Sequence, residues 1–429
     1  MVVSRLDRDG GFCGVIGVPG DKSISHRAVM FGALANGTTT IRNFLPGADC
    51  LATISCFRQM GIEITQCGDE VTVYGKGLRG LNKPDGVLDV GNSGTTIRLL
   101  SGILAGQSFE CQITGDASIK KRPMGRVIKP LTLMGANITS VAENDCAPLS
   151  IKPASLSGIH YDSPVASAQV KSCLLLAGLY ADGNTSVSEP SISRDHTELM
   201  FEAMGITLNR EGTTVTVTPP SELKPLNVVI PSDISSAAYF IVAGLITPDS
   251  DITIQNVGVN STRDGIIHVV KAMGGSIELL NERYEGKELV ADIRVQTSKL
   301  HGCVIEGSLI PTLIDEIPAI AVLACFAEGK TVIKDAAELK VKESNRIDLC
   351  VNNLLRMGVD AVATEDGMII SGGRPLHGAT IETKKDHRIA MSFAIAGMNA
   401  EGETLIEDSD CVEVSFPGFF SKFAELVSQ

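Results

Sequence analysis

Charged residues stand at the starts of several predicted helices in this chain of 429 residues. In "PGDKSISHR", Gly20 permits a turn, Ser23 can cap the helix, and Lys22 places a full charge at its N-terminus. Helix N-termini offer unpaired N–H groups and a partial positive charge, so they attract anions. Arg27 follows Ser23 by four residues and lies on the same helical face. The alternative interpretation is an ordinary capped helix with solvated charges.

Similar motifs recur along the first half of the chain. In "GNSGTTIRLL", Asn92 and Gly94 allow a backbone to approach a ligand closely. In "KKRPMGR", Arg122 stands at a helix start, where it is the cation best placed to point toward a ligand. In "SPVASAQVKS", Ser167 and Gln169 open an apolar helix and suit phosphate or sugar hydroxyls. Solvated charge and simple capping remain the alternatives for each.

The second half adds carboxylates to the cations. Asp315 opens an apolar helix, and a carboxylate beside several cations stays ionised and can act as a general base. Its alternative role is to complement the helix dipole. In "LKVKESNRI", Lys342 and Arg346 stand at i and i+4 with Glu343 between them; an exposed helix pair is the alternative, and we predict a helix around Ile347–Gly358. Arg388 in "KKDHRIAM" precedes an apolar stripe, which predicts that it faces a cleft.

These helix starts belong to a unit that occurs six times. A short apolar strand begins near Val15, Val87, Ile159, Val228, Val304 and Thr380. Each unit reads β-α-β-α-β-β, and the strand-like N-terminus is expected to complete the last one. In the first unit we predict strands at Val15–Val18, Thr38–Asn43, Ile62–Thr65 and Val71–Tyr74, with helices at Ile24–Ala35 and Ala48–Met60.

Comparison of the first and fourth units supports a function for Lys22. Both units have Pro, then Asp, then Ser at the start of an apolar helix, yet Ile234 takes the place of Lys22 in the fourth. The scaffold therefore does not require this lysine.

Six units could form one closed propeller or solenoid. The pairing of the first and fourth units favours instead an α/β (α+β) fold of two domains with three units each. We expect one domain from residues 1–20 plus 232–429 and a second from residues 21–231, with ligands bound in a cleft between them.

Composition limits the classes of partner. A net charge of −13 argues against a nucleic-acid or anionic-membrane surface. The eleven cysteines show no zinc-ligand spacing. Their odd number in a long chain indicates reduced thiols in the cytoplasm. The N-terminus has no signal-peptide core, and the chain has no long apolar run. Nucleotide-binding glycine motifs are also missing. We expect a cytoplasmic protein, a monomer, without metal or cofactor.

The motifs "GDKSISHR", "GNSGTTIRLL", "GDASIKKRPM", "ASAQVKSCLLLAGLY", "VKESNRI" and "DHRIAM" resemble, in order, those of the 3-phosphoshikimate 1-carboxyvinyltransferase family. The resemblance implies two domains, each of three repeats around a pseudo-threefold axis, an inside-out α/β barrel. It also implies transfer of the enolpyruvyl group of phosphoenolpyruvate to the 5-hydroxyl of shikimate 3-phosphate, with release of phosphate. The reaction proceeds by addition and elimination and needs no metal.

The resemblance also implies roles for individual residues. The expected shikimate 3-phosphate ligands are Lys22, Ser23, Arg27, Ser167, Ala168, Gln169, Arg194, Asp315 and Lys342. The expected phosphoenolpyruvate ligands are Lys22, Asn92, Gly94, Arg122, Gln169, Arg346, His387 and Arg388. Asp315 would accept the proton of the 5-hydroxyl, Glu343 would exchange a proton with the methylene carbon, and Lys22 would take part in catalysis.

Two departures and two alternatives accompany the resemblance. Some family members carry a lysine before the C-terminal "FP", where this chain has Glu413 and Val414. Some have Tyr in the region of Arg194. A UDP-N-acetylglucosamine enolpyruvyl transferase would carry Cys in place of Ala117 and Asn in place of Ser23. A non-catalytic anion-binding protein would not need its carboxylates. Because Gly94 leaves room beside phosphoenolpyruvate, we also expect sensitivity to glyphosate.

Overall fold

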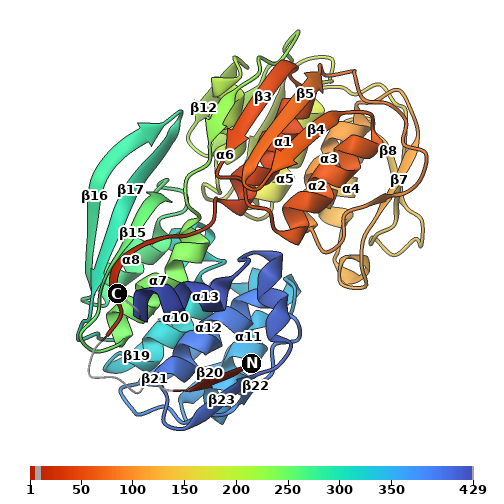
Figure 1. Cartoon of the computed structure of the whole chain (residues 1–429). Coiled ribbons are helices and arrows are strands. Elements are labelled where there is room, and N and C mark those ends of the chain that lie inside the picture. Colours follow the sequence, from red (N-terminus) through yellow and green to blue (C-terminus); the bar gives the residue numbers. More distant parts are fainter. Residues whose placement is uncertain (5–10, 428–429) are drawn as a thin grey trace. The chain divides into compact units, whose positions relative to one another are not determined.

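The computed structural model describes residues 1–4 and 11–427, and its chain divides into two compact units (Figure 1). Unit 1 comprises Met1–Pro19, Pro231–Tyr284 and Leu289–Gln429. Unit 2 comprises Gly20–Ile230 and Glu285–Glu288. The chain therefore passes from unit 1 to unit 2 after Pro19 and returns after Ile230.

Unit 2 contains three four-stranded sheets. Their strand orders are β14-β3-β5-β4, β6-β7-β9-β8 and β10-β11-β13-β12. In each sheet the first two strands are parallel and the others antiparallel. The strands are β3 (Asn36–Arg42), β4 (Glu63–Cys67), β5 (Glu70–Lys76), β6 (Leu88–Asp89), β7 (Cys111–Thr114), β8 (Asn137–Ser140), β9 (Leu149–Lys152), β10 (His160–Asp162), β11 (Thr185–Ser188), β12 (Leu208–Glu211), β13 (Thr214–Val217) and β14 (Asn227–Val229).

Unit 1 has a similar arrangement within its described residues, with two four-stranded sheets and one three-stranded sheet. Its sheets have the orders β16-β17-β15-β2, β18-β19-β21-β20 and β1-β23-β22. The strands are β1 (Val2–Ser4), β2 (Cys13–Gly17), β15 (Asp251–Gly258), β16 (Ser276–Glu285), β17 (Glu288–Gln296), β18 (Val304–Ile305), β19 (Gly329–Ile333), β20 (Asp360–Ala363), β21 (Met368–Gly372), β22 (Thr380–Ile381) and β23 (Glu403–Ile406). The predicted β-α-β-α-β-β repeat is thus confirmed.

The first and fourth repeats exchange their first strands. Strand β2 lies parallel to β15, with Ile16 opposite Ile254. Strand β14 lies parallel to β3, with Val228 opposite Ile41. The exchange occurs where the chain passes between the units. The N-terminal strand β1 pairs antiparallel with β23 and completes the sixth sheet, as predicted.

Helices that are apolar on all sides fill the centre of each unit, as expected of a core helix. In unit 1, helices α7, α10 and α12 contact one another pairwise, and every residue of α7 is buried. In unit 2, α3 packs against α1 and α5. At the α3–α5 contact, a methyl group on Gly102 would lie 2.2 Å from the carbonyl oxygen of Cys173, so only glycine permits this approach.

More amphipathic helices and short 3₁₀ turns surround these cores. The helices of the described residues, core and surrounding together, are α1 (Lys22–Leu34), α2 (Ala48–Gln59), α3 (Gly94–Ala105), α4 (Gly125–Leu133), α5 (Ala168–Gly178), α6 (His196–Ala203), α7 (Ile234–Ile246), α8 (Gly265–Ala272), α9 (Ile310–Leu313), α10 (Ile317–Cys325), α11 (Arg346–Arg356), α12 (His387–Met398) and α13 (Phe419–Val427). The 3₁₀ turns are η1 (Ile119–Lys121), η2 (Gly307–Leu309), η3 (Ala337–Val341) and η4 (Ser409–Val414).

Among the described residues, no single helix combines the length and hydropathy of a membrane span. Gly307–Leu313 and Ile317–Cys325 reach that composition only together, as a pair bent by 108°.

Candidate active site

Helices α1 and α7 begin at equivalent positions. Asp21 caps α1 by accepting the Ile24 N–H at 2.8 Å, and Asp233 caps α7 by accepting the Ser235 N–H at 2.9 Å. Lys22 and Ile234 are the first residues of these helices. The prediction that Ser23 caps α1 was wrong, because the preceding aspartate already fills that role.

Lys22 and Arg27 lie at the N-terminal end of α1. The ammonium of Lys22 is 3.1 Å from a carboxylate oxygen of Asp49. Arg27 is buried and donates to Thr197 Oγ1 at 2.7 Å, Ser172 Oγ at 2.9 Å and the Ser23 carbonyl at 3.0 Å. Burial lowers the pKa of Arg27 to about 10, which still leaves it charged near neutral pH. Hydroxyls from α5 and α6 thus fix the direction of this guanidinium.

A second guanidinium group lies beside the start of α3. Arg122 Nη2 donates to Asn92 Oδ1 at 2.7 Å and to Ser118 Oγ at 3.1 Å. A methyl group on Gly94 would lie 3.0 Å from Arg122 Nη1 and 3.3 Å from Arg98 Nη1. Gly94 therefore leaves space that two guanidinium groups border.

Arg98 is a residue that the sequence interpretation missed. It is buried, donates through Nη1 to Gln169 Oε1, and donates through Nη2 to the Pro123 carbonyl at 3.5 Å. Gln169 in turn donates to Thr95 Oγ1 at 3.1 Å. Its position one helical turn after Gly94, within the same quoted motif, was the available signal.

The expected shikimate-phosphate loop lies at the start of α5. Ser167 caps that helix through its hydroxyl, Ala168 is its first residue, and the Ser167 N–H donates to Glu189 Oε1 at 2.8 Å. Arg194 is partly exposed and precedes α6. The neighbouring Asp195 pairs with Arg210 at 3.2 Å.

In unit 1, Asp315 lies among three cations. Its carboxylate is 3.5 Å from Lys342 Nζ, 3.5 Å from Arg346 Nη1 and 3.9 Å from Arg388 Nη2. The side chain of Asp315 is 12% exposed, so it can still be reached from solvent. The expected grouping of Asp315 with these cations is present.

Arg346 is held by two carboxylates. It is buried and makes a two-point contact with Asp386, at 2.8 Å through Nε and 3.2 Å through Nη2. Its Nη2 also donates to Glu343 Oε2 at 2.6 Å. Burial alone would lower the pKa of Arg346, but Asp386, Glu343 and Asp315 together raise it. Asp386 lies within the motif "KKDHRIAM", but the sequence analysis assigned it no role.

Arg388 and His387 begin α12, which Asp386 caps by accepting the Arg388 N–H at 3.0 Å. Arg388 Nη1 donates to the Asp315 carbonyl at 3.2 Å. Burial lowers the pKa of Arg388, but Asp315, Tyr239 and Glu316 together outweigh this effect, so the net shift is upward. His387 is buried beside it.

The alternative interpretation of Lys342 and Arg346, an exposed pair on one helix, was wrong. Helix α11 begins only at Arg346, and Lys342 has an extended backbone after the turn η3. The Asn345 side chain accepts the Asp348 N–H at 3.3 Å and caps the helix there. This cap places the start of α11 next to Ile347, where the sequence predicted the helix to begin.

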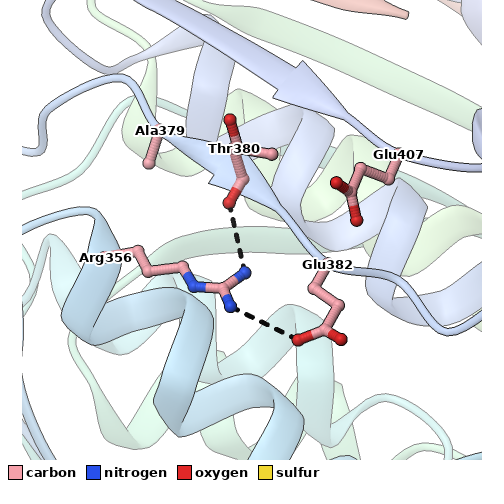
Figure 2. Close-up of a pocket in the computed structure, with 5 residues that line it drawn as sticks. All are labelled: Arg356, Ala379, Thr380, Glu382 and Glu407. Carbon is pink, nitrogen blue, oxygen red and sulfur yellow. Dashed lines mark hydrogen bonds and ion pairs between the residues drawn. The ribbon is translucent and has the colours of Figure 1, made fainter.

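Two other regions contain none of the predicted substrate-binding residues. Glu413 is exposed and accepts the Gly418 N–H at 3.2 Å, next to partly exposed Val414. A hollow of about 510 Å³ in unit 1 is lined by Arg356, Ala379, Thr380, Glu382 and Glu407, which Figure 2 draws as sticks. There Arg356 donates to the Thr380 carbonyl at 3.4 Å and to Glu382 at 3.3 Å. Two carboxylates make this hollow a poor site for anionic substrates.

The fold and its cation-bearing helix starts define the class of enolpyruvyl transferases. The structure of the enolpyruvyl transferase NikO from Streptomyces tendae matches with a TM-score of 0.80 at 15% identity, covering 99% of this chain and 97% of that one, which establishes the shared fold. A model of the family described as EPSP synthase (3-phosphoshikimate 1-carboxyvinyltransferase) matches residues 9–423.

Closer relatives identify the family. A 3-phosphoshikimate 1-carboxyvinyltransferase of Brevibacillus brevis is 60% identical over 406 residues, 95% of each chain. One from Thermoanaerobacter pseudethanolicus is 58% identical over 410 residues, 96% of each. The structure of EPSP synthase from Acinetobacter baumannii has a TM-score of 0.88 at 47% identity, covering 99% of this chain and 98% of that one. The chain belongs to the EPSP synthase family.

Family membership fixes the reaction. The protein is a transferase that moves the enolpyruvyl group of phosphoenolpyruvate to shikimate 3-phosphate, a step of the shikimate pathway toward aromatic amino acids. The two alternatives raised by the sequence are not supported by these similarities.

Proposed function

We propose that Asp315 is the general base of this transfer and accepts the proton of the 5-hydroxyl of shikimate 3-phosphate. The observation that carries the proposal is its position within 4 Å of Lys342, Arg346 and Arg388. Neighbouring cations favour the ionised carboxylate, which is the form a base requires.

The shikimate 3-phosphate ligands on unit 2 are proposed to be Lys22, Ser23, Arg27, Ser167, Ala168, Gln169 and Arg194, with Asp315 and Lys342 added from unit 1. Arg27 supports this assignment because three hydrogen bonds already direct its guanidinium. Charged donors fixed in advance bind a dianionic phosphate without further reorganisation.

Phosphoenolpyruvate is proposed to bind Lys22, Asn92, Gly94, Arg122 and Gln169 from unit 2 and Arg346, His387 and Arg388 from unit 1. Guanidinium groups suit both its carboxylate and its phosphate. Protonation of the methylene carbon gives oxocarbenium character at C2, and the departing phosphate gains charge that the arginines stabilise. Glu343, 2.6 Å from Arg346, would exchange the methylene proton.

The test is phosphate release from shikimate 3-phosphate and phosphoenolpyruvate by Asp315→Asn. We expect kcat to fall by roughly 10²-fold or more, as for loss of a general base, while the Kd of shikimate 3-phosphate changes far less. Asp360→Asn replaces an exposed aspartate of the same unit and serves as the control. A kcat within tenfold of the unmodified protein would remove Asp315 from this role.

The arrangement at larger scale is also proposed. Units 1 and 2 would act as the two domains expected near residues 1–20 plus 232–429 and 21–231, with both substrates bound by groups from each. The protein would act as a cytoplasmic monomer; none of its eleven cysteines forms a disulfide in the structure, which supports a reducing compartment. Light scattering should give the mass of one chain, 45.3 kDa, with or without substrates; twice that mass would contradict the monomer.

A further inference from the structure

A buried cation lies between α5 and α6 in unit 2, and none of the roles above uses it. The side chain of Lys171 is 2% exposed, and its ammonium pairs with Glu189 at 3.0 Å and Glu198 at 2.8 Å. The ammonium also donates to the Ser193 carbonyl at 3.2 Å. Burial opposes the charge of Lys171, but the two carboxylates together raise its pKa, so the lysine remains an ammonium ion.

Glu189 connects two loops through its two oxygens. Oε1 accepts the Ser167 N–H at 2.8 Å. Oε2 accepts the Ser193 N–H at 3.3 Å and the Ser193 hydroxyl at 2.8 Å. Ser193 is therefore fixed through its backbone nitrogen, its hydroxyl and its carbonyl. Arg194 is the next residue, so its backbone starts from a fixed point.

The adjacent residues of the same two helices hold Arg27. Ser172 follows Lys171 on α5, and Thr197 precedes Glu198 on α6. Their hydroxyls lie 2.7 Å apart, and both accept hydrogen bonds from Arg27. The polar contacts between α5 and α6 thus support Ser167, Arg194 and Arg27, which are all expected ligands of shikimate 3-phosphate.

We propose that Lys171, Glu189 and Glu198 form a positioning cluster for the shikimate 3-phosphate ligands, an inference that rests on the residue roles proposed above. The cluster touches no substrate in this scheme. It holds the Ser167 and Ser193–Arg194 backbones in place, so that binding does not have to order them. Arg122, on the phosphoenolpyruvate side, is held separately by Asn92 and Ser118. The cluster should therefore affect one substrate more than the other.

Glu189→Gln tests the connection between the loops. The amide keeps one acceptor oxygen but loses the charge and the second acceptor. We expect the KM for shikimate 3-phosphate to rise about tenfold or more, since small misplacements of binding groups are costly. The kcat and the KM for phosphoenolpyruvate should stay within about twofold. Amide hydrogen exchange at Ser167 and Ser193 should accelerate.

Gln107→Leu is the matched control. Gln107 is a buried polar residue of the same unit that donates to the Leu78 and Ile103 carbonyls, away from these ligands. This variant should lower Tm without changing the KM for shikimate 3-phosphate. The control separates general destabilisation of unit 2 from mispositioning of ligands.

Two further variants distinguish a loss of stability from a change in the binding of shikimate 3-phosphate. Lys171→Met leaves two buried carboxylates without a cation and should lower Tm. Lys171→Met combined with Glu198→Gln removes one of those charges and should recover much of the Tm. The KM for shikimate 3-phosphate should nevertheless remain raised, because Ser193 and Glu189 still lack the ammonium.

The proposal fails if both KM values rise equally, if the KM for shikimate 3-phosphate follows Tm as in the control, or if the double variant restores that KM. Failure of the proposed function looks different, because Asp315→Asn would then keep a kcat within tenfold of that of the unmodified protein. In that case calorimetric titration with shikimate 3-phosphate still decides the question. Equal affinity of the unmodified protein and Glu189→Gln would overturn the cluster, and weaker binding by the variant would support it.

Discussion

At the scale of single residues, the binding groups are fixed by protein contacts before any substrate arrives. Arg27, Arg122 and Arg346 each use several donors on protein acceptors. Such contacts reduce the rotamer entropy that a long side chain would lose on binding. The remaining donors and charge are then available in a fixed direction. The space left beside these groups then decides, together with the groups themselves, whether a ligand can bind.

Gly94→Ala tests that space. The added methyl group would meet Arg122 Nη1 at 3.0 Å and Arg98 Nη1 at 3.3 Å, so at least one guanidinium must shift. We expect a higher KM for phosphoenolpyruvate and weaker inhibition by glyphosate, by about tenfold each, as a displaced binding group would cause. The KM for shikimate 3-phosphate should change little.

Gly86→Ala is the control for this prediction, because nothing lies within 4 Å of a methyl group there. Steady-state kinetics with each substrate varied in turn, with and without glyphosate, provide the measurement. Unchanged inhibition in Gly94→Ala, or an inhibition constant of the unmodified protein far above its KM for phosphoenolpyruvate, would contradict the expectation.

At the scale of elements, buried polar contacts align the helix starts with one another. His26 on α1 contacts Thr53 on α2 at 2.7 Å, and Thr53 contacts Thr96 on α3 at 2.7 Å. Thr96 donates to Ser93, the cap of α3, at 2.7 Å. The three helices that carry Lys22, Asp49 and Gly94 are thereby joined through one chain of side chains. His26 Nε2 is buried and has no hydrogen-bond partner among the described residues.

This chain of contacts predicts a pH dependence of stability. Burial, followed by the charges of Lys22 and Arg27, lowers the pKa of His26 well below 6.5, against a smaller opposing effect of Asp21. Above pH 6.5 the histidine is neutral in both folded and unfolded chains, so its contribution is complete. Below that pH the unfolded chain takes up a proton first, and stability falls by up to about 1.4 kcal/mol per pH unit.

Thermal unfolding between pH 7.5 and 5 measures this effect. His26→Gln should be less stable than the unmodified protein at pH 7.5 but should show a flatter decline of Tm with acid. His301→Gln, which replaces an exposed histidine, should keep the original slope. If His26→Gln and the unmodified protein decline in parallel, His26 does not titrate as described.

At the scale of the whole molecule, the exchange of β2 and β14 means that a repeat is not the folding unit. Unit 2 is almost entirely one contiguous segment, Gly20–Ile230, and it includes β14 from the fourth repeat. Without β14, strand β3 would become an exposed edge. A fragment that ends with the third repeat, before β14, would therefore lack one strand of this sheet. A fragment that ends with unit 2, at Ile230, would keep that strand.

Two fragments test this point. Residues 20–230 should fold cooperatively, whereas residues 20–226 should be less stable by about 2 kcal/mol or more, because they lose the burial of Ile230 as well as the β14–β3 pairing. Urea unfolding followed by circular dichroism gives the comparison. Equal midpoints would show that β14 contributes nothing to unit 2.

The sequence alone determined the repeat, most element positions and the chemical character of the site. Periodic apolar residues and helix-start signals depend on local physics, so the repeats, the shared start of α1 and α7, and the group around Asp315 could be predicted. The exchange of β2 with β14 and the roles of Arg98 and Asp386 could not. They depend on which strand edges and buried charges meet after folding, and only the tertiary structure brings together groups so distant in sequence.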